Sequence, residues 1–83
     1  MASKFQTKII KQYESKGYYV INLSKTNKNG IADLLCLKEG VKPLFVECKE
    51  SWDTLKPLQK YRLKEVTKYG CESVCLKNKL VKL

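Results

Sequence analysis

The sequence predicts a small α/β protein of mixed α+β type, in which helices flank a central mixed β-sheet. Apolar residues at helical spacing occur near the start of the chain and in its second half, and β-branched and aromatic runs lie between them. The expected order is helix, three strands, helix and strand. With 83 residues and no internal repeat, the chain is expected to form one domain over residues 1–83.

The first helix is expected from Ser3 to Lys16, because its apolar residues follow one helical arc and Gly17 is a natural C-terminal stop. A polar residue, Gln6, falls in the middle of this arc. It should therefore either bond within the core or point into a polar site. The apolar residues of the arc are Phe5, Ile9, Ile10 and Tyr13.

The first strand is expected from Tyr18 to Leu23, a run of β-branched and aromatic residues. The polar segment that follows, Ser24–Gly30, contains turn residues and is expected to be a surface loop. Its two lysines, Lys25 and Lys28, either clamp a phosphate backbone or are merely solvated.

Two further strands are expected to form a hairpin, at Ile31–Leu37 and from Pro43 or Leu44 to Lys49, joined by a loop at Lys38–Lys42. Side chains alternate along a strand, so Glu47 and Lys49 share one face. A slip of one residue in register would separate the charges, so their convergence depends on this loop length. The expected cross-strand pairs are Leu37 with Pro43, Leu35 with Phe45 and Asp33 with Glu47.

The second helix is expected from Leu55 or Pro57 to Tyr69, with Gly70 at its end. Gln59 and Arg62 fall within its apolar arc, near the helix start, where they could reach the charged cluster of the hairpin. For Arg62 the alternative is a side-chain stem lying along the border of the helix. The arc contains Leu55, Leu58, Leu63, Val66 and Tyr69; a fourth strand is expected at Glu72–Leu76, and residues 78–83 are unassigned.

The chain is strongly basic, with 17 Lys and Arg against 8 Asp and Glu and a formal net charge of +9. This balance favours a polyanionic partner such as nucleic acid, and the alternative is a soluble protein that is simply rich in lysine. No apolar run approaches the roughly 20 residues of a membrane span, and the first residues do not resemble a signal peptide. We therefore expect a cytoplasmic protein without membrane association.

Four cysteines are present, and in a reducing compartment they are expected to remain buried thiols, not disulfides or zinc ligands. The sequence contains no histidine. Any catalysis must therefore use carboxylates, lysine and a metal. The cysteines are Cys36, Cys48, Cys71 and Cys75.

Asp33 and Glu47 would repel each other at close range, and a divalent cation would resolve that conflict. Oxygen ligands suit Mg²⁺, with Mn²⁺ able to substitute, and the backbone carbonyl of Cys48 could join them. Such a metal would polarise a phosphodiester, while Lys49 could position the attacking water. The alternative is that these charges form ion pairs at a sheet edge, where they guard against aggregation.

The motif Gly30-x-x-Asp33-Leu34, followed by Glu47-x-Lys49 and by Leu58-Gln59 at a helix start, resembles the PD-(D/E)XK nuclease superfamily. Over nearly the whole chain it is most similar to small virus-type VRR-NUC domains and archaeal Holliday junction resolvases. The resemblance implies a restriction-endonuclease-like core and hydrolysis of DNA to a 5′-phosphate and a 3′-hydroxyl. It also implies that Asp33 and Glu47 bind Mg²⁺, that Lys49 serves the attacking water and that Gln59 supports the site.

Two positions depart from the family pattern. Many relatives have a glutamate on the first helix where this chain has Gln6, and a proline before the aspartate where it has Ala32. The small Ala32 should be harmless. Gln6 removes a negative charge from the site, although it could still hold a metal-bound water.

These observations predict a stand-alone, Mg²⁺-dependent endonuclease for branched or structured DNA, without a small-molecule cofactor; a virus-encoded enzyme acting in its host cell also fits. A homodimer is expected, because a thin core favours an apolar interface and a symmetric junction needs two cuts. Two alternatives are a non-catalytic nucleic-acid-binding relative, with Gln6 as the sign of lost activity, and a small basic RNA-binding protein. The residues expected to grip phosphates are Lys25, Lys28, Lys56, Lys60 and Arg62.

Overall fold

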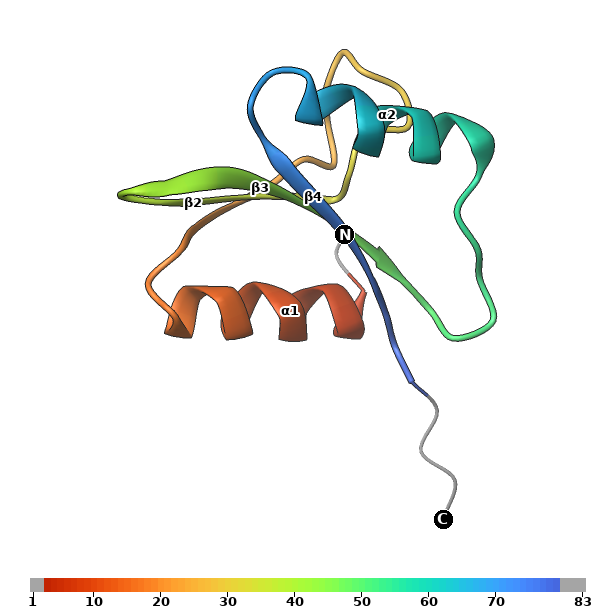
Figure 1. The fold of residues 1–83 in the computed structure, drawn as a ribbon. Helices are drawn as coiled ribbons and strands as arrows, with labels where there is room; N and C mark the ends of the chain where they lie inside the picture. Colours follow the sequence, from red (N-terminus) through yellow and green to blue (C-terminus); the bar gives the residue numbers. More distant parts are fainter. Residues whose placement is uncertain (1–2, 80–83) are drawn as a thin grey trace.

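A four-stranded sheet lies between two helices in the computed structural model, which describes residues 3–79 (Figure 1). The expected order of elements and the mixed α+β class are both confirmed. The elements are α1 (Lys4–Ser15), β1 (Tyr19–Asn22), β2 (Leu34–Lys38), β3 (Val41–Lys49), α2 (Pro57–Thr67) and β4 (Glu72–Lys77).

The first helix, α1, has the boundaries that its sequence predicts to within one residue at each end. Ser3 caps it, because the Ser3 hydroxyl accepts a hydrogen bond of 3.1 Å from the backbone N–H of Gln6. The chain leaves the helix at Gly17, which has a φ of +90° that side chains rarely adopt. Phe5 and Ile9 are buried, so the predicted apolar arc faces the sheet.

The strands lie in the order β1-β2-β3-β4. The β1–β2 and β2–β3 pairs are antiparallel, whereas β4 is parallel to β3, and α2 makes the crossover that a parallel pair requires. The sheet is therefore mixed, as expected, and β3 is an interior strand. Between α1 and the sheet lies a core of Phe5, Ile9, Leu34, Cys36 and Val46.

The start of β2 differs from the expectation, since the strand begins at Leu34 and not at Ile31. The N–H of Ile31 closes a turn by donating to the carbonyl of Lys28 at 3.2 Å. The carbonyl of Asp33 accepts a hydrogen bond of 2.8 Å from the N–H of Leu23, the residue that follows β1. Residues 31–33 are apolar enough to resemble a strand, but their backbone bonds belong to the loop.

The hairpin turn is also shorter than expected: it consists of Glu39 and Gly40, and β3 begins at Val41. The pairing of Leu37 with Pro43 was expected and is wrong, because the register shifts between Cys36 and Lys38. Pro43 has no N–H to contribute to a ladder at this place. The observed pairs are Leu34 with Val46, Leu35 with Phe45, Cys36 with Leu44 and Lys38 with Val41.

The second helix, α2, covers the face of the sheet opposite α1 and packs mainly against β4 (Figure 1). Val66 is the buried residue of α2, and the hydroxyl of Ser73 in β4 donates to the carbonyl of Leu63 at 2.8 Å. Tyr69 was expected in the apolar arc but is 82% exposed, because the helix ends at Thr67. The fourth strand is confirmed, and of the unassigned segment 78–83, residues 80–83 lie outside the described residues.

All four cysteines are free thiols, as expected, but only Cys36 is fully buried and the other three are half-buried. Burial raises the pKa of the Cys36 thiol to about 11, so it stays protonated at neutral pH. Between residues 3 and 79, neither helix is long and apolar enough to cross a membrane.

Candidate active site

Glu47 and Lys49 lie at the C-terminal end of β3 and are both buried, with exposed fractions of 3% and 6%. They share one face of the sheet because they are two residues apart. The ladder with β2 ends at Val46, but both side chains are almost completely buried, so these charges do not lie on an exposed sheet edge. The interpretation of the charges as guards of an exposed edge is therefore wrong for Glu47 and Lys49.

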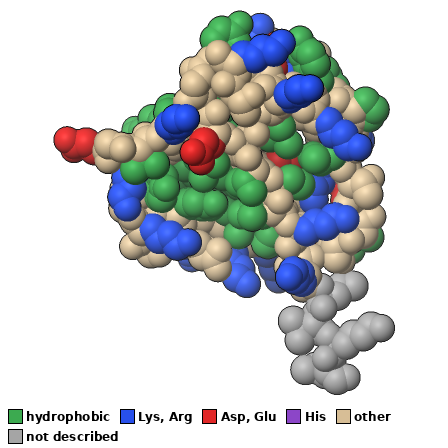
Figure 2. Space-filling view, viewed as in Figure 1, with side chains coloured by type: hydrophobic (Ala, Val, Ile, Leu, Met, Phe, Trp, Pro, Cys, Tyr) green, Lys and Arg blue, Asp and Glu red, His purple; other side chains and the backbone are tan. Residues whose placement is uncertain are grey.

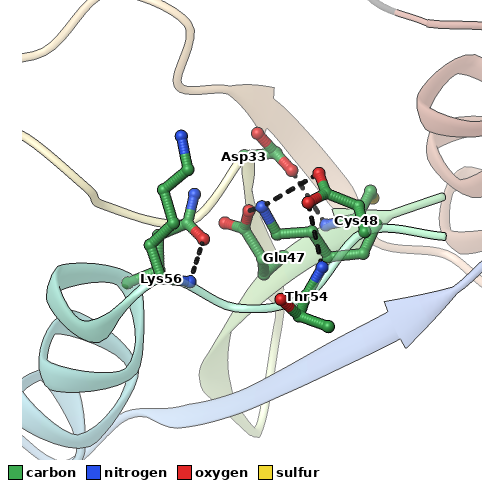
Figure 3. A network of polar contacts seen from close by, with 8 residues as sticks. Asp33, Glu47, Cys48, Thr54 and Lys56 are labelled. Carbon is green, nitrogen blue, oxygen red and sulfur yellow. Dashed lines mark hydrogen bonds and ion pairs between the residues drawn. The ribbon is translucent and has the colours of Figure 1, made fainter.

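Asp33 lies immediately before β2, one position beyond the pair of Leu34 with Val46. Its Oδ2 accepts a hydrogen bond of 2.8 Å from the backbone N–H of Cys48. Continuing the ladder by one step puts Asp33 opposite Glu47, as expected, although the ladder itself stops at Leu34. Figure 3 shows Asp33, Glu47 and Cys48 gathered at this end of the sheet.

The ammonium of Lys49 has two acidic neighbours. Its Nζ lies 3.6 Å from Oε2 of Glu47 and 3.6 Å from Oδ2 of Asp53. The other oxygen of Asp53 accepts from the backbone N–H of Thr54 at 2.9 Å, which fixes the carboxylate. The sequence reasoning missed Asp53 because it lies in the linker after β3; its only signal is an acid four residues after Lys49.

Burial and the negative charge of Asp33 raise the pKa of Glu47 from 4.5 to about 7, although Lys49 acts in the opposite direction. Near neutral pH, the carboxyl of Glu47 is therefore partly protonated in the metal-free protein. A bound cation would favour the ionised form and would relieve the repulsion between the two carboxylates.

The donor set near Asp33 and Glu47 fits a magnesium-type cation better than zinc. Within the described residues, no group of three His, Cys, Asp or Glu side chains is positioned to hold a metal. Two carboxylates and the backbone carbonyl of Cys48 are a set that Mg²⁺ accepts, because this ion keeps several waters and is often held by one or two carboxylates. A closed zinc site would require four protein ligands.

Gln59, expected to reach the cluster, lies in the first turn of α2. Its Oε1 accepts a hydrogen bond of 2.9 Å from the backbone N–H of Lys56, so the side chain caps the helix. Figure 3 shows Lys56 near Glu47. Gln6 is half-buried in the first turn of α1. Among the described residues, no hydrogen bond joins the side chain of Gln59 or Gln6 to Asp33, Glu47 or Lys49.

The expected phosphate-binding residues fall into two groups. Four are exposed lysines, two on the loop before Asp33 and two at the start of α2: Lys25, Lys28, Lys56 and Lys60. Arg62 is instead engaged within the protein, since its Nε donates to the carbonyl of Asn29 at 2.9 Å and its Nη1 pairs with Glu65 at 2.9 Å. Figure 2 shows many basic and few acidic side chains on the visible face.

No protein-family model matches this chain, and no curated protein sequence matches it. Its fold is similar to that of Hjc, a Holliday junction resolvase from the archaeal hyperthermophile Archaeoglobus fulgidus, with a TM-score of 0.68 and 14% sequence identity. The match covers 87% of this chain and 65% of the resolvase, so this chain spans about two thirds of that protein's length. At this identity the likeness establishes the fold alone.

Proposed function

We propose that this protein is a divalent-metal-dependent endonuclease that hydrolyses phosphodiester bonds in branched DNA. The observation that carries the proposal is the pair of buried charges Glu47 and Lys49 at the end of β3, with the half-buried Asp33 beside them, within a resolvase-like fold. Burying charges is costly unless they have a task or a partner. A metal-assisted reaction on a phosphate gives each of the three a task.

Mg²⁺, or Mn²⁺ in its place, would be held by the carboxylates of Asp33 and Glu47 and the backbone carbonyl of Cys48. When bound, such an ion supplies charge neutralisation at the phosphate and lowers the pKa of a coordinated water. The N–H of Cys48 holds Asp33 by its Oδ2, which orients this carboxylate before any ligand arrives. Gln6 would contribute only through a water.

Lys49 is assigned to the attacking water and to the negative charge that grows on the phosphate oxygens. Lys49 is only 6% exposed, and a buried charge acts more strongly than one in bulk water. Gln59 supports the site indirectly, because it caps the helix that begins beside the cluster. Hydrolysis in this class is expected to leave a 5′-phosphate and a 3′-hydroxyl.

The exposed lysines on both sides of the cluster would bind the phosphate backbone, so affinity for DNA should fall steeply with salt.

We propose a homodimer for a branched substrate, because two cuts require two sites. The monomer buries only a few apolar residues and leaves Tyr19 70% exposed on β1. Sedimentation at several protein concentrations tests this, and a monomer at all concentrations contradicts it. The enzyme would act in the cytoplasm of its own cell or, if virus-encoded, of the host.

The experiment that tests the function measures cleavage of a four-way junction, a flap and a linear duplex, with Mg²⁺, with Mn²⁺ and with a chelator. We expect metal-dependent cleavage of the branched DNA by the wild type and loss of cleavage in Lys49→Ala. The matched control is Lys64→Ala, which removes an exposed lysine of α2 and should leave cleavage intact. If neither metal supports cutting of any substrate, the enzymatic proposal is wrong.

A second candidate is a non-catalytic DNA-binding relative. It is favoured by the small donor set, because among the described residues no group of three His, Cys, Asp or Glu side chains could hold a metal. In addition, Gln6 occupies the helix position at which many members of the resembled superfamily carry an acid. This candidate predicts junction binding without cutting, and a junction affinity that Asp33→Asn and Lys49→Ala leave largely unchanged. The enzyme instead loses its cutting in both variants.

A further inference from the structure

A polar pocket adjoins the cluster on the side of the loop between β1 and β2. It has a volume of about 250 Å³ and is lined by residues 23, 24, 26 and 28–33. Lys28 contributes a cation and Thr26 a hydroxyl, and Asp33 belongs both to this pocket and to the cluster. The roles proposed above for Asp33, Glu47 and Lys49 do not assign a ligand to this pocket.

The loop that forms the pocket is held by its own hydrogen bonds. The Thr26 hydroxyl donates to the carbonyl of Lys28 at 3.2 Å and accepts from the N–H of Lys28 at 3.3 Å. The N–H of Ser24 donates to Oδ1 of Asn22 at 2.9 Å, and Ile31 closes the turn on Lys28. The pocket is therefore formed before a ligand arrives, which lowers the ordering cost of binding.

Two contacts also fix the loop to α2. Arg62 Nε donates to the carbonyl of Asn29 at 2.9 Å. Gly30 packs so closely on Leu58 that a Cβ added at Gly30 would lie 2.7 Å from Leu58 Cγ. The pocket consequently keeps a defined position relative to the helix that begins beside the cluster.

The pocket is smaller than the roughly 300–1,000 Å³ of typical ligand sites, so it suits a fragment of the size of one sugar and phosphate. Its lining is mostly polar and contains no aromatic ring on which a base could stack. Lys28 supplies the positive charge that a phosphate needs. The expected occupant is thus the backbone of a strand, not its bases.

We propose that this pocket binds the sugar-phosphate unit that adjoins the scissile bond, with its phosphate on Lys28. The inference rests on the proposed nuclease function, because it takes the scissile phosphate to lie at Asp33 and Glu47. Recognition of this unit is independent of base sequence. The enzyme would therefore recognise the position of one strand's sugar-phosphate backbone next to the cut, whatever the base sequence.

The test uses junction substrates that carry a single neutral methylphosphonate at the first phosphate on either side of the cut. On one side, this change should raise KM of the wild type about tenfold while kcat stays nearly constant, as expected for the loss of one charge-assisted hydrogen bond. An abasic sugar at the same position should be cut as well as the normal nucleotide, because no base enters the pocket.

The variant is Lys28→Met, and Lys64→Met, on the exposed side of α2, is its matched control. Lys28→Met should show the raised KM on normal DNA and no further loss with the methylphosphonate, whereas Lys64→Met should behave as the wild type. If the methylphosphonate acts equally on the wild type and on Lys28→Met, or if the abasic sugar abolishes cutting, the pocket does not bind this unit.

The same comparison can be made by fluorescence anisotropy of labelled junctions in a chelator, where no cutting occurs. Coupling between Lys28 and one phosphate, together with no cleavage when Mg²⁺ or Mn²⁺ is supplied, would support the pocket and reject the nuclease. Metal-dependent cleavage without this coupling would support the nuclease and reject the pocket. The two hypotheses therefore fail separately.

Discussion

The buried ammonium of Lys49 lies at the same distance, 3.6 Å, from the carboxylates of Glu47 and Asp53. Asp53 is half-exposed and is fixed by the N–H of Thr54, whereas Glu47 is almost completely buried. If Glu47 binds a metal ion and no longer pairs with Lys49, Asp53 is the acid that still pairs with Lys49. We therefore expect Asp53 to act as a positioning residue for Lys49.

The change Asp53→Asn should lower kcat about three- to tenfold and leave KM nearly unchanged, since a half-exposed ion pair contributes modestly and the residue does not touch the substrate. Steady-state cleavage of a junction measures both constants. Asp53→Glu should recover part of the lost kcat, because it restores the charge. An equal loss in both variants, or an effect confined to KM, would exclude the positioning role.

The raised pKa of Glu47 makes the stability of the metal-free protein depend on pH. The folded state keeps this proton up to about pH 7, whereas the unfolded chain releases it near pH 4.5. This favourable contribution is complete below pH 4.5, and it is lost as the pH rises to about 7. It amounts to about 3 kcal/mol at most.

Urea unfolding at pH 4, 5, 6, 7 and 8 in a chelator measures this effect, with Glu47→Gln as the reference that cannot titrate. The wild type should lose stability relative to the variant between pH 4.5 and 7 and then stay level. Mg²⁺ should restore wild-type stability at pH 8 and have little effect on Glu47→Gln. A constant difference between the two proteins from pH 4 to pH 8 would contradict the shifted pKa.

The glutamine at position 6 can be replaced by the acid that the resemblance leads one to expect. Gln6→Glu should lower the Mg²⁺ concentration needed for half-maximal cleavage about tenfold, because a further carboxylate increases the ligand charge. The matched control is Gln12→Glu, which adds the same charge on the exposed side of α1. An equal response of the two variants would show a general charge effect and would remove Gln6 from the site.

The close packing of Gly30 on Leu58 predicts a difference between two glycines. Gly30 and Gly40 both have a φ of +78°, so alanine strains the backbone equally at either place, but only at Gly30 would its Cβ collide with a side chain. Gly30→Ala should therefore cost about 1–3 kcal/mol more than Gly40→Ala in urea unfolding. Leu58→Ala should relieve this excess in the double variant; equal costs at the two glycines would contradict the docking of the loop.

Much of the fold follows from local signals in the sequence. Ser3, Gly17 and the apolar arc of α1 fix the first helix, and Pro57 opens the second. The boundaries of β2 are less well predicted, because an apolar run such as Ile31-Ala32 suits a strand whether or not a ladder forms there. Which backbone groups pair is decided by the turn at Lys28, not by the residues of the run.

The site is predicted in part for a similar reason. The period of a strand and an assumed turn length predict that Asp33, Glu47 and Lys49 lie together. The turn is shorter than assumed, and the register shift between Cys36 and Lys38 keeps the expected pair of Leu35 with Phe45, although the ladder ends before Asp33. Asp53 could not be predicted, since a four-residue separation in a linker specifies no direction. The hydrogen bond of Gln59 could not be predicted either, because a glutamine at this position can cap the helix or contact a neighbouring site equally well.

The loop and the interior strand differ in how they can change. Glu47 and Lys49 are buried on β3, which pairs with β4 at both positions, so neither can shift without disturbing the sheet. Residues 24–30 are tied to the rest of the molecule chiefly through Asn29 and Gly30. If the proposed function holds, we expect that the loop can be replaced while Glu47 and Lys49 stay in place. A grafted loop that keeps the contacts of Asn29 and Gly30 should then change the DNA shape that is bound without changing the reaction.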